Sequence, residues 1–319
     1  MKKLLFLSLI GLSYLSCNND SAIEKEIANI NIDYKIERFD RQFAVASPND
    51  LKTLKFSYPF LFSKSVPDSI WIMRMQDSLQ NQLFNEVATV FDEPLSVKED
   101  INSLFKHLKY YDKSFTVPRV IALTNDVDYR NKVVVTDTIV LIALDNYLGA
   151  EHPYYQNIQR YIAANMQKNQ IVVDLAEKYA EKCVFPTKRQ SFLDEMIYFG
   201  KLLYFKDRII PFKEDANKIG YSQEELDWAE ANESPIWSYF IEKELLYSTD
   251  PNLSNRFIAN APFSKFYLEL DNESPGRLGQ YIGWQIVRAY AEKNDVGLLQ
   301  LMREEPRVIF ENSNFKPRK

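Results

Sequence analysis

Helical spacing of apolar residues dominates the chain after Gly149. Apolar side chains recur every three or four residues at about 155–167, 170–182, 188–205, 222–231, 235–247, 275–293 and 296–304. This spacing places the apolar side chains along one face of an α-helix. The second half of the chain is therefore predicted to form a body of packed helices.

The first half mixes helix and strand patterns. Residues 32–37 alternate apolar and charged side chains, and three strand-like runs follow at 119–123, 132–135 and 138–144. Such alternation is typical of strands with one solvent-exposed face. The predicted fold class is α+β, with a small mixed or antiparallel sheet against a mostly helical body.

Three helices are predicted within this first half, at 47–55, from Pro67 onward and at 97–111. The second is expected to be long and continuous, because apolar residues recur along it at roughly helical spacing. Its predicted inward face consists of Ile70, Met73, Leu79, Leu83, Val87 and Val90.

The N-terminus has the form of an export signal. Lys2 and Lys3 precede a short apolar stretch that ends at Ser16-Cys17. About a dozen apolar residues are too few to cross a bilayer core, which needs roughly 20. A small residue directly before a cysteine resembles the lipobox of bacterial lipoproteins, so residues 1–16 are predicted to be removed and Cys17 to be acylated, for example with palmitate.

The predicted mature chain then starts with a tether. Residues 17–30 are polar with little pattern and are expected to be flexible, and residues 31–319 are expected to form a single domain. Cys183 is the only other cysteine, which excludes an intramolecular disulfide once Cys17 is acylated. The domain must therefore be stabilised by packing.

The charge balance argues against nucleic acid as a partner. Removal of residues 1–16 takes Lys2 and Lys3 from the 39 basic residues and leaves 37 against 44 acidic ones, a net charge of −7. Acidic and basic residues are interspersed, whereas a nucleic-acid-binding protein usually carries a basic patch.

The helix at 190–203 contains the sequence Asp194-Glu195-Met196-Ile197-Tyr198. A zinc peptidase of the zincin class places His-Glu-x-x-His on such a helix, because histidines four residues apart share one face and bind zinc. Here Asp194 and Tyr198 stand at the histidine positions, and the chain contains only His107 and His152. We therefore expect no metal, no cofactor and no catalytic residue, with a divergent metallohydrolase that uses Glu195 as the base as the alternative.

The helix at 275–293 carries a possible protein-binding stripe. Arg277, Tyr281, Trp284 and Arg288 are predicted to lie opposite its apolar residues, and arginine and aromatic side chains are enriched in interfaces. Gly276, Gly279 and Gly283 lower helix stability by about 1 kcal/mol each relative to alanine. Their clustering predicts that another element approaches this backbone closely.

Five segments together resemble one known family over nearly the whole chain. They are Ser16 to Asp20, Ile36 to Asp40, Phe192 to Tyr198, Glu244 to Ser248 and Pro262 to Tyr267. They are similar to segments of the gliding-motility lipoprotein family GldB.

This resemblance implies a component required for bacterial gliding and a zincin-like (gluzincin) domain that has lost its metal-binding motif. It also implies a non-catalytic protein in the cell envelope, anchored through Cys17 to a membrane, expected to be the outer membrane facing the periplasm. Its expected partners are other proteins of the gliding or secretion apparatus.

Overall fold

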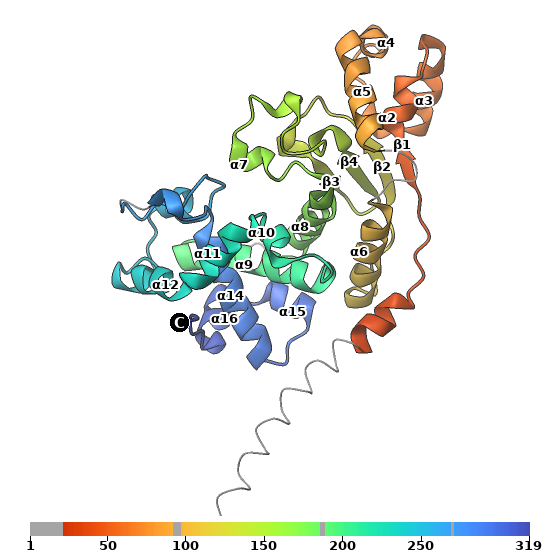
Figure 1. The fold of residues 1–319 in the computed structure, drawn as a ribbon. Helices are drawn as coiled ribbons and strands as arrows, with labels where there is room; N and C mark the ends of the chain where they lie inside the picture. The colour runs from red at the N-terminus through yellow and green to blue at the C-terminus, as the bar shows by residue number, and fades with distance from the viewer. Residues whose placement is uncertain (1–21, 92–96, 186–188, 269–270) are drawn as a thin grey trace, which may run out of the picture.

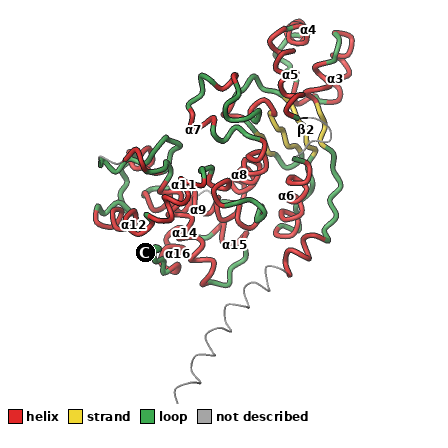
Figure 2. The backbone as a smooth tube through the Cα atoms, in the orientation of Figure 1, coloured by secondary structure: helices red, strands yellow, loops and turns green. Residues whose placement is uncertain are grey.

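The computed structural model describes residues 22–91, 97–185, 189–268 and 271–319. The chain forms a four-stranded sheet with helices on both faces and a larger helical body beside it (Figures 1 and 2). The predicted α+β class, mostly helical with a small sheet, is confirmed.

The sheet is mixed, and its strands lie in the order β1-β2-β4-β3. Strands β1 (Ile36–Arg38), β2 (Arg119–Leu123) and β4 (Ile139–Ala143) are parallel, while β3 (Val133–Val135) pairs antiparallel with β4. The three strand-like runs after residue 118 correspond to β2, β3 and β4. The strand expected from residue 32 begins only at Ile36.

The two faces of the sheet belong to different cores. Val120, Ala122 and Ile142 contribute to the main core, together with α6 (Lys98–Tyr111) and the helical body. Ile121 points the other way, into a smaller core formed with α2 (Phe39–Ala44), α3 (Leu51–Ser57), α4 (Asp68–Gln76) and α5 (Ser78–Val90). Because successive side chains of a strand alternate, one short sheet supports both cores.

The prediction of one long helix from Pro67 is wrong in one respect, because the structure has two helices, α4 and α5, separated at Asp77. The Asp77 side chain accepts the backbone N–H of Gln80 at 2.8 Å and caps α5, which begins at the next residue. A new helix direction changes which side chains face the core. Ile70, Met73 and Leu79 are therefore exposed rather than buried.

The helical body contains ten helices within the described residues. They are α7 (Arg160–Ala163), α8 (Ile171–Cys183), α9 (Phe192–Ile209), α10 (Asp215–Ile219), α11 (Gln223–Ala231), α12 (Glu233–Glu242), α13 (Asn252–Phe257), α14 (Leu278–Lys293), α15 (Leu298–Arg303) and α16 (Pro306–Ser313). The helix predicted at 155–167 reduces to the single turn of α7. Helices α10, α13 and α16 were not predicted, since helices of five to eight residues show little periodicity.

Helices α9 and α14 cross at the centre of this body with their backbones in close approach. A Cβ atom at Gly200 would collide with the carbonyl of Gly283, and one at Gly283 would collide with the carbonyl of Met196. At Gly279 a Cβ atom would lie 2.9 Å from the carbonyl oxygen of Phe257. The close approach predicted from the glycines of α14 is confirmed.

Residues 22–28, which the sequence places in the tether, are helical and contact α6 (Figure 1). Ile27 is buried, and Lys106 donates from Nζ to the carbonyl of Ala28 at 2.8 Å. His107 Nε2 lies 3.3 Å from a carboxylate oxygen of Glu24. These contacts attach the N-terminal helix to the domain.

Candidate functional site

Asp194 serves as a capping residue of α9. Its carboxylate accepts the backbone N–H groups of Ser191 at 2.9 Å and Gln190 at 3.0 Å, while the Ser191 hydroxyl accepts the N–H of Asp194. This reciprocal pair is a capping box, which satisfies N–H groups that the first helical turn leaves free. The carboxylate that stands at a histidine position of the zincin motif is thus bound to backbone.

Glu195 and Tyr198 are both half-buried on α9. The Arg189 guanidinium lies 4.2 Å from the centre of the Tyr198 ring, and burial raises the pKa of the Tyr198 phenol. A phenol that stays protonated is a poor metal ligand. Among the described residues, no hydrogen bond or ion pair engages the Glu195 side chain.

The two histidines are each engaged locally. His107 Nδ1 lies 2.8 Å from the carbonyl oxygen of Ser103, and its Nε2 faces Glu24. His152 accepts the N–H of Tyr154, and its Nε2 lies 3.4 Å from Glu86. The described part of the chain contains no group of three or more His, Cys, Asp or Glu side chains placed to hold a metal ion.

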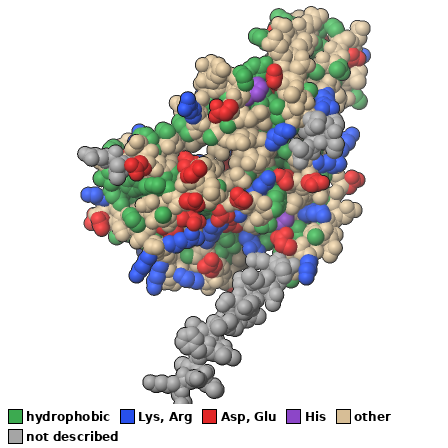
Figure 3. Space-filling model, viewed as in Figure 1, with side chains coloured by type: hydrophobic (Ala, Val, Ile, Leu, Met, Phe, Trp, Pro, Cys, Tyr) green, Lys and Arg blue, Asp and Glu red, His purple; other side chains and the backbone are tan. Residues whose placement is uncertain are grey.

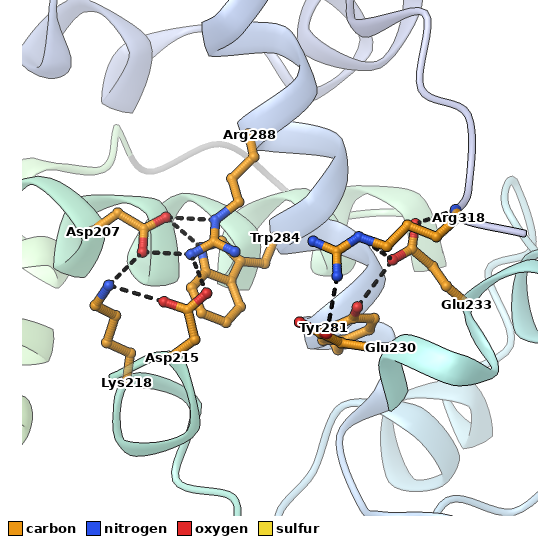
Figure 4. Close-up of polar contacts among 9 residues, drawn as sticks. All are labelled: Asp207, Asp215, Lys218, Glu230, Glu233, Tyr281, Trp284, Arg288 and Arg318. Carbon is orange, nitrogen blue, oxygen red and sulfur yellow. Dashed lines mark hydrogen bonds and ion pairs between the residues drawn. The ribbon is translucent and has the colours of Figure 1, made fainter. Parts of the chain in front are cut away.

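The stripe predicted on α14 is not an exposed interface, and this prediction is wrong. Tyr281 and Trp284 are fully buried. Arg288 is mostly buried too, with 23% of its side chain exposed. The physical reason is that acidic residues of this same chain pair with the stripe (Figure 4).

Asp207 on α9 is the centre of one such cluster. It accepts two hydrogen bonds from Arg288, each 2.7 Å long, and a third from Trp284 Nε1 at 2.8 Å. Asp215 lies 2.8 Å from Arg288, and Lys218 lies 3.0 Å from both aspartates (Figure 4). Two carboxylates and two cations thus balance one another between α9, α10 and α14.

Tyr281 belongs to a second cluster. Its hydroxyl donates to Glu233 at 2.9 Å, and the backbone N–H of Arg318 donates to the same carboxylate at 3.0 Å. The Arg318 guanidinium also reaches Glu230 at 3.0 Å (Figure 4). This cluster attaches the C-terminal segment to α11, α12 and α14.

Arg277, the first residue of the stripe, lies elsewhere, on a cleft. Its φ of 61° is left-handed, a conformation uncommon for a residue other than glycine. Arg277 Nη2 donates to the carbonyl of Gly220 at 2.8 Å, whereas its Nε is buried without a partner.

The cleft consists of two adjoining hollows of about 400 and 580 Å³. They share the residues Asn165, Gln170, Gly220, Asn260 and Arg277. One wall comes from β3, α7 and α8, and the other from the end of α10 and the start of α14. Figure 3 shows the surface hollowed between the part that carries α7 and the helical body.

The smaller hollow is basic. Its lining includes two acidic side chains, Asp174 and Glu177, and six basic ones, which are Arg130, Lys132, Lys178, Lys206, Lys218 and Arg277. Lys206 lies 2.7 Å from Glu177 and lowers the pKa of that carboxyl to about 2, so Glu177 is ionised at neutral pH. No sequence pattern predicted this cleft, because its residues are spread from Tyr129 to Gln280.

Cys17, the predicted acylation site, lies outside the described residues. Cys183, at the end of α8, is a free thiol that is half-buried. No described helix has both the length and the apolar character needed to span a bilayer.

The fold and the site together define a helical α+β protein with a cleft that is basic in its smaller hollow and with Asp194 engaged as a helix cap. Residues 20–317 match the model of the family described as gliding motility protein GldB, so the chain belongs to this family. It is thus a gliding-motility-related protein. No curated protein and no solved structure is found to match it.

Proposed function

We propose that the protein is a lipid-anchored, non-catalytic component of the gliding machinery that acts by contact with other envelope proteins. The role of Asp194 as a helix cap carries this proposal. A peptidase would need that position as a metal ligand, and here two backbone N–H groups bind the carboxylate. A zincin-like ancestry that lost its metal site is consistent with this use.

The docked N-terminal helix supports action at the membrane surface. Cys17 lies five residues before Ala22, the first described residue of the N-terminal helix. Five residues span at most about 18 Å even when fully extended. Acylation of Cys17 would therefore hold the folded domain against the bilayer, which we take to be the periplasmic face of the outer membrane.

The anchor is tested by Cys17→Ala. We expect the variant to leave the membrane fraction of lysed cells, because two or more acyl chains are needed for stable attachment. Cys183→Ala is the matched control and should remain with the membrane. Full membrane association of the Cys17→Ala chain would contradict the anchor.

The non-catalytic role is tested by Glu195→Ala. We expect cells that carry this variant at the wild-type protein level to glide normally, because the proposed function uses no general base. Loss of gliding by both Glu195→Ala and Glu195→Gln, together with stoichiometric zinc in the purified wild-type protein, would instead support the metallohydrolase.

A further inference from the structure

We propose that the basic cleft binds an acidic peptide segment of a protein partner, with Arg277 and Arg130 as its main contacts. This inference rests on the contact role proposed above and adds where the partner binds and what chemistry it presents. Four observations carry it: the charge of the lining, the pairing of its cations, the state of Arg277 and the shape of the cleft.

The smaller hollow of the cleft carries a charge opposite to that of the chain, whereas the larger hollow is balanced, with Arg160 and Arg277 against Glu151 and Glu225. The whole protein has a formal net charge of −5, yet the smaller hollow is lined by six basic and two acidic side chains. A concave surface with one sign of charge focuses the electrostatic field and attracts ligands of the other sign. The complementary ligand is an anion.

Four of the six cations are neutralised within the chain. Lys132 pairs with Asp174 at 2.6 Å, Lys178 with Glu181 at 2.9 Å and Lys206 with Glu177 at 2.7 Å. Lys218 pairs with Asp207 and Asp215.

Arg130 and Arg277 are different. Among the described residues, no carboxylate forms an ion pair within 4.0 Å of either guanidinium, although the nearby Asp128 attracts Arg130 electrostatically. Arg130 is exposed, and its guanidinium lies 5.5 Å from the centre of the Tyr129 ring. These two arginines are therefore available to an external anion.

Arg277 is held in place but uses few of its donors. A guanidinium has five N–H groups, and Arg277 makes one hydrogen bond, to Gly220, besides lying 5.2 Å from the Tyr221 ring centre. Its left-handed backbone and its unpaired, buried Nε both cost free energy. A carboxylate at the remaining Nη donors would add a charge-assisted hydrogen bond to a side chain that is already oriented.

The shape of the cleft favours a chain over a single ion. The two hollows meet at Arg277 and together are far larger than one carboxylate or phosphate requires. The Asn165 amide donates to the carbonyl of Gly220 at 3.0 Å and joins the two walls where the hollows meet, so a segment that occupies both hollows must cross this bridge. An extended acidic segment could lie along both hollows and pass Arg277.

The test uses detergent-solubilised full-length protein and a short fluorescein-labelled oligoglutamate, with binding followed by fluorescence anisotropy. We expect binding that weakens as salt is raised, and no binding of the matched oligoglutamine. Arg277→Gln and Arg130→Gln should each weaken binding by about tenfold, the value of one charged hydrogen bond. Arg307→Gln, an exposed arginine on α16, should bind as the wild type does.

Three results would overturn the inference. One is an oligoglutamate affinity that Arg130→Gln leaves unchanged, since this exposed side chain can be replaced without loss of the fold. Another is equal binding of oligoglutamine. The third is inorganic pyrophosphate binding as tightly as the peptide, which would make the cleft a small-anion site.

The proposal for the cleft and the proposal for the lipid anchor can be refuted independently of each other. If the Arg130→Gln/Arg277→Gln strain glides normally while the Cys17→Ala strain does not, the anchored role stands and the cleft inference is wrong.

Discussion

Replacement of Gly283 by alanine tests the central packing of the fold. A Cβ atom at this position would lie 1.9 Å from the carbonyl oxygen of Met196, about 1.5 Å short of the 3.4 Å at which ordinary contact begins. Both colliding groups are fixed, because one belongs to the backbone of α14 and the other to that of α9. The substitution must therefore push two buried helices apart.

The expected magnitude follows from two opposing effects. Overpacking a buried site costs about 1–3 kcal/mol, and a backbone collision belongs at or above the upper end of that range. Alanine in place of glycine within a helix stabilises the folded state by about 1 kcal/mol through its higher helix propensity. We expect Gly283→Ala to lower the free energy of unfolding by about 2 kcal/mol or more.

Gly297 provides the matched control, because a Cβ atom there would meet nothing within 4 Å. It is the N-cap of α15, where alanine is less favourable than glycine, while alanine also reduces the entropy of the unfolded chain. These effects oppose, and we expect a change within about 0.5 kcal/mol. Urea unfolding followed by tryptophan fluorescence measures both variants, and equal midpoints for Gly283→Ala and the wild type would refute the reasoning.

Three further predictions concern buried charge and orientation. Arg288→Met should lower the free energy of unfolding by about 2 kcal/mol, because Asp207 and Asp215 lose a partly buried partner. Arg307→Met, at an exposed ion pair, is the control and should change the free energy of unfolding by less than about 0.5 kcal/mol. Equal losses for the two variants in urea unfolding would contradict this prediction. Burial lowers the pKa of Lys201 to about 8, below its unfolded value of about 10.4, so the unfolded chain binds more protons between these pH values. The stability of the wild type relative to Lys201→Met should therefore rise by up to about 3 kcal/mol across that range, and a constant difference in unfolding free energy would count against the shift. In the acylated protein on vesicles with brominated lipids, a fluorophore at Phe212→Cys should be quenched, because Phe212 lies 6.3 Å from the ring of His107 beside the N-terminal helix. The same label at exposed Phe56→Cys, on α3 at the far end of the molecule (Figure 1), should not be quenched. Both labelled variants also carry Cys183→Ser, so that only the introduced cysteine is labelled. Equal quenching of the two labels would contradict this orientation of the protein on the membrane.

Elements with a strong local pattern could be predicted from the sequence. Strands β2, β3 and β4 follow from runs of branched apolar residues between turn residues, and α8, α9, α11 and α14 from long helical periodicity. The glycines of α14 also carried tertiary information. Gly279 and Gly283 are unfavourable in a helix unless a neighbour requires the space, and Phe257 and Met196 are such neighbours.

The candidate site could not be predicted in the same way, because its partners are distant in sequence. An arginine and a tryptophan on one helical face look alike whether they face another protein or acidic residues of their own chain. Only the fold brings Asp207 to Trp284 and Arg288, and Glu233 to Tyr281. The cleft likewise combines Arg130, Asn165 and Arg277, which share no local motif.

The buried charges of α14 have a consequence for the cleft, because α10 joins the two. Asp215 and Lys218 at the two ends of α10 are held by Arg288 and Asp207. The helix then ends at Gly220, whose carbonyl accepts hydrogen bonds from both Asn165 and Arg277. A wall fixed in this way loses little conformational entropy when a ligand binds. We infer that the stripe predicted as an interface instead stabilises the wall on which Arg277 is positioned.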